Sequence, residues 1–176
     1  RIIDLMLLNG VEVKRLATDT DMELDMYYIE DYKTVSKPFE GHYLHSQVKL
    51  QVQKQRVNFY AGDYIIYTNQ SKNRYIVEVL EPQAVDSFFN WNFFDSVLGQ
   101  KEHFSNYVFE DEAARLLAEN SDLLRDLQEE KKKNQEFRDN STAQLDWIYK
   151  RSVHYEKTYL RYPVGRMILP AKPQLK

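Results

Sequence analysis

The stretch GHYLHSQVKLQVQKQRVNFY, residues 41–60, carries the clearest strand signal in the chain. Its apolar side chains share one parity and its amide and lysine side chains the other: Leu44, Val48, Leu50 and Val52 against Gln47, Lys49, Gln51 and Gln53. Because successive side chains of a strand point to opposite faces, this alternation predicts a half-buried strand. Lys54-Gln55 is expected to turn the chain, so that Val57 and Phe59 begin the return strand of a hairpin.

The preceding segment, residues 21–35, shows the same period of two. Two sets of residues alternate along it: Met22, Leu24, Met26 and Tyr28 at one parity, and Glu23, Asp25 and Tyr27 at the other. A turn is expected at Ser36-Lys37-Pro38. Residues 17–70 are therefore predicted to form an antiparallel β region, a small sandwich-like sheet.

The chain opens with an apolar helical pattern over residues 1–9 that Asn9-Gly10 should stop. Val11, Val13 and Leu16 then indicate a short strand. No capping residue precedes this helix, so we expect residues 1–16 to be a helix and strand that continue from an upstream domain.

Residues 71–176 are predicted to be mainly helical and to pack on the β region as one structural unit. Helical spacing begins at Tyr75 and stops at Glu81-Pro82, and further helices are expected from Tyr107, after a cap at Ser121-Asp122, and around residues 145–149. Residues 159–169 should form a final extended segment. The fold class is thus predicted to be α+β, with an antiparallel β-rich first half and a helical second half.

Composition excludes several classes of function. The 176 residues carry a formal net charge of −3, which gives no reason to expect a nucleic-acid partner. The absence of cysteine excludes disulfides, thiolate metal sites and a cysteine nucleophile. No apolar stretch approaches the roughly 20 residues needed to span a bilayer.

Ionisable residues offer weak candidates for catalysis or metal binding. His42 and His45 stand three apart, and such positions of a strand point to opposite faces, so a shared metal ion would need a bend. Glu23 and Asp25 share a face and could mimic a paired-carboxylate site, although the solvent face of an amphipathic strand explains them better. No catalytic or metal-binding residue is therefore assigned.

The segment Phe88-Phe89-Asn90-Trp91-Asn92-Phe93-Phe94 has five aromatics in seven residues. They cannot all face water at tolerable cost, so most should be core or should cover a neighbouring domain. Asn90, Trp91, Asn92 and Phe93 are the candidate interdomain or binding surface. The alternative is a platform on which sugars stack.

Several strings together resemble the region that follows the catalytic domain in large bacterial zinc carboxypeptidase-like metallopeptidases, especially those of Bacteroidetes. They include Tyr28-Ile-Glu-Asp-Tyr32, Phe39-Glu-Gly-His42, Gly62-Asp-Tyr-Ile-Ile-Tyr-Thr-Asn-Gln70, Asp86-Ser-Phe-Phe-Asn-Trp-Asn-Phe-Phe-Asp95 and Tyr159-Leu-Arg-Tyr-Pro163. The resemblance covers nearly the whole chain.

The resemblance implies a parent protein whose zinc is held upstream by a His-x-x-Glu pair and a later His, with Glu as general base. This chain contains no His-x-x-Glu, so no catalytic residue is carried over. The resemblance implies a non-catalytic accessory region whose partner is the upstream peptidase domain of the same polypeptide, exported to the periplasm or outside the cell.

Two alternatives from other functional classes stay open. One is a β-sandwich module that binds glycan, peptidoglycan or protein, with Trp91 as a stacking platform. The other is an autonomous hydrolase that uses Glu23, Asp25 or His42. A buried Trp91 would argue against the first, and the second requires turnover by this chain alone.

Overall fold

The computed structural model describes residues 1–101 and 104–168, so Leu169, the expected end of the last extended segment, lies outside the described residues. The chain divides into two compact units. The first holds Arg1–Gly99 and the chain from Thr158 on, and the second holds Gln100–Lys157. This division differs from the expected single unit over residues 71–176, because the later helices pack against one another around a core of their own.

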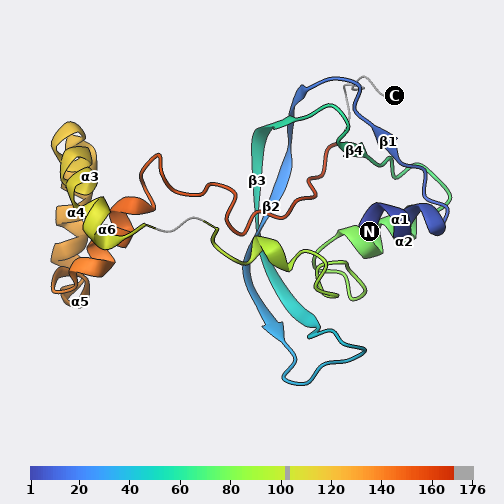
Figure 1. The fold of residues 1–176 in the computed structure, drawn as a ribbon, viewed down its shortest axis with the longest axis horizontal. Helices are drawn as coiled ribbons and strands as arrows, with labels where there is room; N and C mark the ends of the chain where they lie inside the picture. Colours follow the sequence, from blue (N-terminus) through green and yellow to red (C-terminus); the bar gives the residue numbers. More distant parts are fainter. Residues whose placement is uncertain (102–103, 169–176) are drawn as a thin grey trace. The chain divides into compact units, whose positions relative to one another are not determined.

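The first unit is built on a long antiparallel ribbon of β2 (Thr20–Thr34) and β3 (His45–Phe59), which Figure 1 shows as two crossing strands. The turn predicted at Lys54-Gln55 is wrong, since both residues lie inside β3 and pair with Asp25 and Leu24. The chain turns between the two strands instead. Glu40 and Gly41 adopt positive φ there, at 47° and 81°. That turn includes the predicted Ser36-Lys37-Pro38.

The ribbon buries both of its faces, at different points along its length. Leu24 and Met26 are buried at one parity, and Tyr27 and Ile29 at the other. A right-handed twist rotates the faces along a two-stranded ribbon, so neighbouring stretches can meet different parts of the core. The face formed by Tyr27 and Ile29 packs on Phe89 and Tyr162 rather than on a second sheet.

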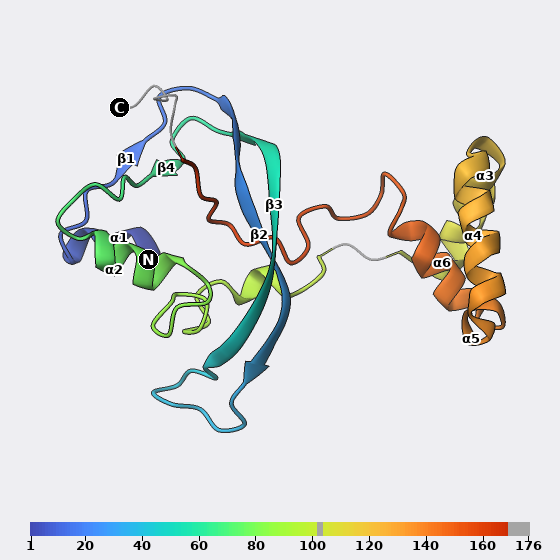
Figure 2. The same cartoon turned by 180° about the vertical axis from the view of Figure 1, so that it is seen from behind.

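The segment after Thr158 returns along the outer edge of β2. Asp25 and Arg166 exchange two backbone hydrogen bonds of 2.9 Å, and the Tyr162 N–H donates to the Tyr27 carbonyl at 2.8 Å. Figure 2 shows this segment passing the middle of the ribbon. Gly165 allows a close approach there, because a Cβ at this position would collide with the side chains of Leu24 and Met26 unless they moved.

A smaller layer completes the first unit. The strands β1 (Lys14–Arg15) and β4 (Tyr64–Ile65) pair as a second two-stranded sheet, next to α1 (Ile2–Leu8) and α2 (Asn73–Leu80) in sequence. The predicted stop after residue 9 is confirmed by Gly10, whose φ is +75°. The core of this smaller layer consists of Met6, Val11, Ile76, Val79 and Phe88. Antiparallel sheets in the first half of the chain and mostly helices in the second half confirm the predicted α+β class.

The second unit contains α3 (Asn106–Glu119), α4 (Ser121–Lys133), α5 (Gln135–Arg138) and α6 (Ser141–Tyr149). Asn120, Asn134 and Asn140 cap the last three helices, each accepting a backbone N–H with its side chain. The cap of α4 is thus one residue earlier than predicted. No helix in the described ranges is long and apolar enough to cross a membrane.

Candidate interaction surface around Trp91

The aromatic segment 88–94 divides between core and surface. Phe89 is fully buried and its ring centroid lies 5.1 Å from that of His45, 5.8 Å from Tyr32 and 6.1 Å from Tyr162. Phe88 and Asn90 are also buried, whereas Trp91 and the following Asn92, Phe93 and Phe94 are half-buried. The expectation that most of these aromatics serve the core therefore holds for the first part of the segment.

The half-buried aromatics join others from the turn between β2 and β3. A backbone bridge between Phe39 and His42 folds this turn back on itself. The Trp91 ring centroid lies 6.2 Å from Phe39 and 5.5 Å from His42, and His42 stacks on Phe93 at 6.2 Å. We call Phe39, His42, Trp91 and Phe93 the aromatic surface.

An exposed tyrosine and a cation lie next to the aromatic surface. Phe39 is 55% exposed, and Tyr43, in the same turn, is 52% exposed. The guanidinium of Arg1 lies 5.0 Å from the Phe93 ring centroid, a cation–π distance. The sequence prediction of a surface at residues 90–93 did not include Phe39 or Tyr43. In the sequence, the only indication that Phe39 and Tyr43 belong to this surface is the density of aromatic residues in the turn itself.

The two asparagines of the segment donate their amide N–H groups to backbone carbonyls. Asn90 Nδ2 donates to the carbonyls of Ala84 and Val85 at 2.7 and 3.1 Å. Asn92, at φ 64°, donates to the Tyr43 carbonyl at 2.8 Å and lies 3.1 Å from His45 Nε2. The surface is therefore aromatic, and the amide N–H groups next to it are already hydrogen-bonded within the chain.

His45 lies beneath this surface and is buried. Its Nδ1 is 3.0 Å from Thr34 Oγ1, and its Nε2 is 3.0 Å from Asp95 Oδ1. A general base must reach the proton that it removes. This requirement argues against His45 as a base, because its side chain is only 5% exposed. The arrangement ties together the ends of the two long strands and the short 3-10 helix η1 (Asp95–Val97).

The structure does not join His42 and His45 in a metal site. His42 packs between Trp91 and Phe93, while both ring nitrogens of His45 contact Thr34, Asp95 or Asn92. The described residues contain no group of three or more His, Cys, Asp or Glu side chains that could hold a metal ion.

Glu23 and Asp25 face basic residues across the ribbon. Glu23 is paired with Arg56 and Asp25 with Lys54 in the strand register. Opposite charges at directly facing positions stabilise an antiparallel pair. Asp31 and Lys49 form an ion pair of 2.9 Å further along, and this contact lowers the pKa of Asp31. Asp31 is thus ion-paired with β3, whereas Glu23 and Asp25 only face basic residues in the register.

Two buried phenols were not singled out by sequence reasoning. Burial, and secondarily the Glu81 carboxylate, raises the pKa of Tyr27 to about 12. Burial also raises the pKa of Tyr162, which is fully enclosed. Their rings contribute apolar packing at the cost of desolvated hydroxyl oxygens, since the geometry gives neither hydroxyl a hydrogen-bond partner among the described residues.

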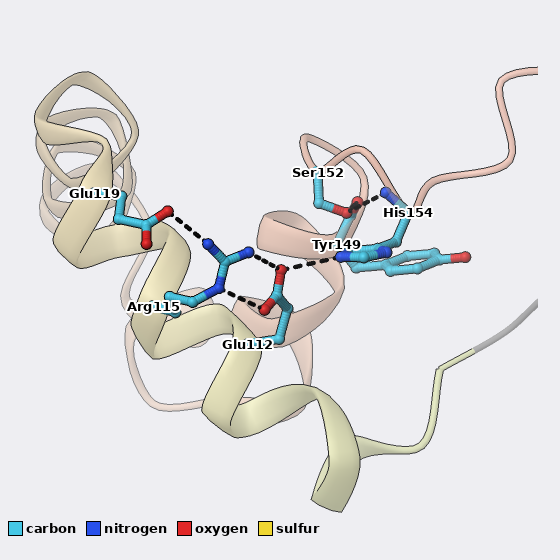
Figure 3. A network of polar contacts seen from close by, with 6 residues as sticks. All are labelled: Glu112, Arg115, Glu119, Tyr149, Ser152 and His154. Carbon is cyan, nitrogen blue, oxygen red and sulfur yellow. Dashed lines mark hydrogen bonds and ion pairs between the residues drawn. The ribbon is translucent and has the colours of Figure 1, made fainter.

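The helical unit holds a polar network on the surface of α3 (Figure 3). Arg115 bridges Glu112 at 2.7 Å and Glu119 at 2.6 Å, and His154 Nε2 lies 3.0 Å from Glu112. The Arg115 hydrogen bond, followed by the one from His154, lowers the pKa of Glu112 to about 2.

Ser152 lies beside this network without completing a catalytic triad. Its hydroxyl donates to the Tyr149 carbonyl at 2.8 Å and accepts the backbone N–H of His154 at 3.2 Å. A serine nucleophile needs its hydroxyl on the imidazole of its base. Here the His154 ring faces Glu112 instead (Figure 3), so these residues fasten the end of α6 to α3.

Comparison of the chain with family models, curated proteins and solved structures gives no match.

Proposed function

We propose that this chain is a non-catalytic accessory region of an exported zinc carboxypeptidase-like metallopeptidase, and that it docks on the peptidase domain through the aromatic surface. Two things support this proposal. One is the ordered set of strings that resembles the post-catalytic region of such proteins. The other is the exposure of clustered aromatic rings at the segment where an interdomain surface is expected.

The aromatic surface carries the argument. Interfaces are enriched in Trp, Tyr and Phe, and a buried Trp at the centre of one commonly contributes about 2 kcal/mol or more to binding. Trp91 is central here, because it contacts Phe39 and His42 from a different segment of the chain. A partner that covered Trp91 would cover all three rings at once.

Zinc enters this proposal only through the upstream domain. The described residues offer no cluster that could hold it, and the sequence lacks the His-x-x-Glu pair that would supply two ligands. The chain's own contribution is to dock and to shape the edge of the peptidase cleft.

Glycan or peptidoglycan binding is the second candidate, favoured by the partial exposure of Trp91. A sugar site combines an aromatic plane with free polar groups that fix the hydroxyls. The amide N–H groups of Asn90 and Asn92 are already donated to backbone carbonyls. The geometry therefore favours an apolar protein surface as the ligand of Trp91.

The experiment begins with the coding sequence upstream of Arg1, which should contain His-x-x-Glu. The upstream domain and this chain are then expressed separately and their affinity is measured by calorimetry. Trp91→Ala should weaken binding roughly thirtyfold, equivalent to about 2 kcal/mol. Tyr60→Ala is the matched control, because Tyr60 is 63% exposed and lies outside the aromatic surface.

Three results would contradict the proposal. They are an upstream sequence without the zinc motif, an affinity that Trp91→Ala leaves unchanged, and stoichiometric zinc bound to this chain and lost on His42→Ala. Quenching of Trp91 fluorescence by peptidoglycan fragments at micromolar concentration would support the glycan-binding alternative instead.

A further inference from the structure

The two outer edges of the β2–β3 ribbon differ in how many hydrogen bonds they make to other segments. The outer edge of β2 is covered by the returning segment, which bonds to Asp25, Tyr27 and Ile29. The backbone groups on the outer edge of β3 make only two hydrogen bonds to other segments in the described part of the chain. They are the His45 N–H to the Asn90 carbonyl and the Gln83 amide to the Val48 carbonyl. Beyond Val48, no backbone group of this edge is hydrogen-bonded to another part of the described chain.

The hydrogen-bond pattern identifies which backbone groups are free. In an antiparallel strand the N–H and C=O of one residue point to the same side, and the side alternates along the chain. Asp25, Tyr27 and Ile29 point away from β3, so Leu24, Met26 and Tyr28 bond to their partners Gln55, Gln53 and Gln51. The backbone groups of the intervening residues therefore point outward: Leu50, Val52, Lys54 and Arg56.

Exposure of the side chains shows that this stretch is open on its faces as well. A half-buried strand alternates between exposed and buried residues, yet Gln51, Val52, Gln53 and Lys54 are all exposed. Val52 is 55% exposed although it faces buried Tyr27 across the ribbon. No Pro interrupts β3, and the bulge of this strand lies before Leu50, between Ser46 and Lys49, so neither device blocks the edge from Leu50 to Arg56.

The charges along the edge define the partner. Apart from His45, the ionisable side chains of β3 are Lys49, Lys54 and Arg56, all basic. Lys49 is ion-paired with Asp31, whereas Lys54 and Arg56 face Asp25 and Glu23 across the ribbon without forming an ion pair within the described residues. A second copy of β3 would add three more basic side chains and no acidic one. An incoming strand with carboxylates would instead find complementary charge.

We propose that the outer edge of β3 from Leu50 to Arg56 binds an extended acidic segment of a partner protein, which adds to the ribbon as a third strand. Backbone hydrogen bonds to the four outward-pointing residues would provide affinity, and Lys54 and Arg56 would select for acidic side chains. This edge contains no residue of the aromatic surface, so the proposal is independent of the docking function.

The test uses the complete chain and a short capped peptide in which Glu alternates with Val and Thr. Amide hydrogen exchange is followed by NMR, residue by residue. In the free protein, the amides of Leu50, Val52, Lys54 and Arg56 should exchange fast, and those of Gln51, Gln53 and Gln55 slowly. The peptide should slow the first group. The same peptide with Lys in place of Glu is the charge control.

Val52→Pro is the decisive variant, because it removes one outward N–H and leaves the bonds between β3 and β2 in place. It should weaken peptide binding by about tenfold. The matched control Val52→Thr keeps the N–H and the strand preference, and should bind like the original chain. Lys54→Glu should weaken binding of the Glu peptide and strengthen that of the Lys peptide.

The proposal is overturned if a saturating Glu peptide leaves exchange along the edge unchanged, or if the Lys peptide binds equally well. Unchanged binding by Val52→Pro also overturns it, provided that the variant keeps slow exchange at Gln51 and Gln53. If Val52→Pro fails to fold, the exchange pattern of the original chain with the two peptides decides alone. Self-association of the chain through this edge would replace the acidic partner by a second copy, and so contradict the proposal.

Discussion

Replacing Phe89 by Ala should be among the most destabilising single changes in the first unit. Phe89 is fully buried, and its ring contacts those of Tyr32, His45 and Tyr162, which lie in three different segments. Truncation of a buried Phe typically costs about 3–5 kcal/mol, through lost transfer free energy and the cavity that remains. Small domains are stable by only about 5–15 kcal/mol, so this change removes a large fraction of the total.

Phe39→Ala is the matched control, because the same atoms are deleted from a side chain that is 55% exposed. It should change the free energy of unfolding by about 0.5–1 kcal/mol. Urea unfolding can be followed by Trp91 fluorescence in a Trp147→Phe background, since the chain has two tryptophans and only Trp91 lies in the first unit. With a slope of about 2 kcal/mol/M, Phe89→Ala should lower the midpoint by about 2 M.

The reasoning is refuted if the two alanine variants unfold at the same urea concentration. It is also refuted if Phe89→Ala costs less than about 1.5 kcal/mol, because the ring would then not fill a closed core. An unchanged unfolding slope is required for the comparison, since a change in slope would indicate an altered unfolded state.

Two further predictions concern pH and backbone packing. The folded pKa of Glu112 is about 2, below the unfolded value of about 4.3, so its contribution to stability is complete above the unfolded pKa and is lost as pH falls through 2. Fluorescence of the tryptophan in α6 should therefore report a loss of stability of the helical unit between about pH 5 and 2. Glu112→Gln should flatten this dependence, and an unchanged pH profile would exclude the Arg115 contact as its source. Gly165→Ala should destabilise the first unit by about 1–3 kcal/mol, because the added methyl collides with Leu24. Gly99→Ala is its control, since a Cβ there meets nothing within 4 Å, and equal urea midpoints for the two variants would contradict the close approach.

Local patterns predicted the helices and strands whose apolar residues recur with a clear period. The strand over residues 21–35 and the helix before Glu81-Pro82 both follow from the spacing of apolar side chains. The turn at Lys54-Gln55 was wrong because neither residue favours positive φ, and because Lys54 can face Asp25 across the ribbon. That pairing joins residues 29 positions apart, so no local window contains it.

The candidate surface was only half accessible to sequence reasoning. The density of aromatics indicated that some rings lie in the core and others at the surface, but it did not indicate which rings lie where. Phe89 enters the core because Tyr162 returns to β2 from far along the chain, whereas Trp91 meets Phe39 because the ribbon turn folds back beside it. Both outcomes depend on long-range contacts that periodicity does not encode.

Irregularities in the ribbon explain why a polar residue lies under an aromatic surface. The register gains one residue on β2 between Ile29 and Asp31, and one on β3 between Ser46 and Lys49. A bulge switches the faces of the residues on either side of it. His45 and Val48 are therefore both buried although they differ in parity.

This switch links the core to the aromatic surface. His45 turns inward, where its ring meets Asp95 and the amide of Asn92. The same amide donates to the Tyr43 carbonyl, so the half-buried side chain of Asn92 joins the turn that carries Phe39 to the segment that carries Trp91. An interface gains affinity when its contact residues are ordered before the partner arrives. The bulged end of the ribbon thus orders the aromatic surface in the way that the proposed docking would require, while along its regular end no other described segment bonds to the outer edge of β3.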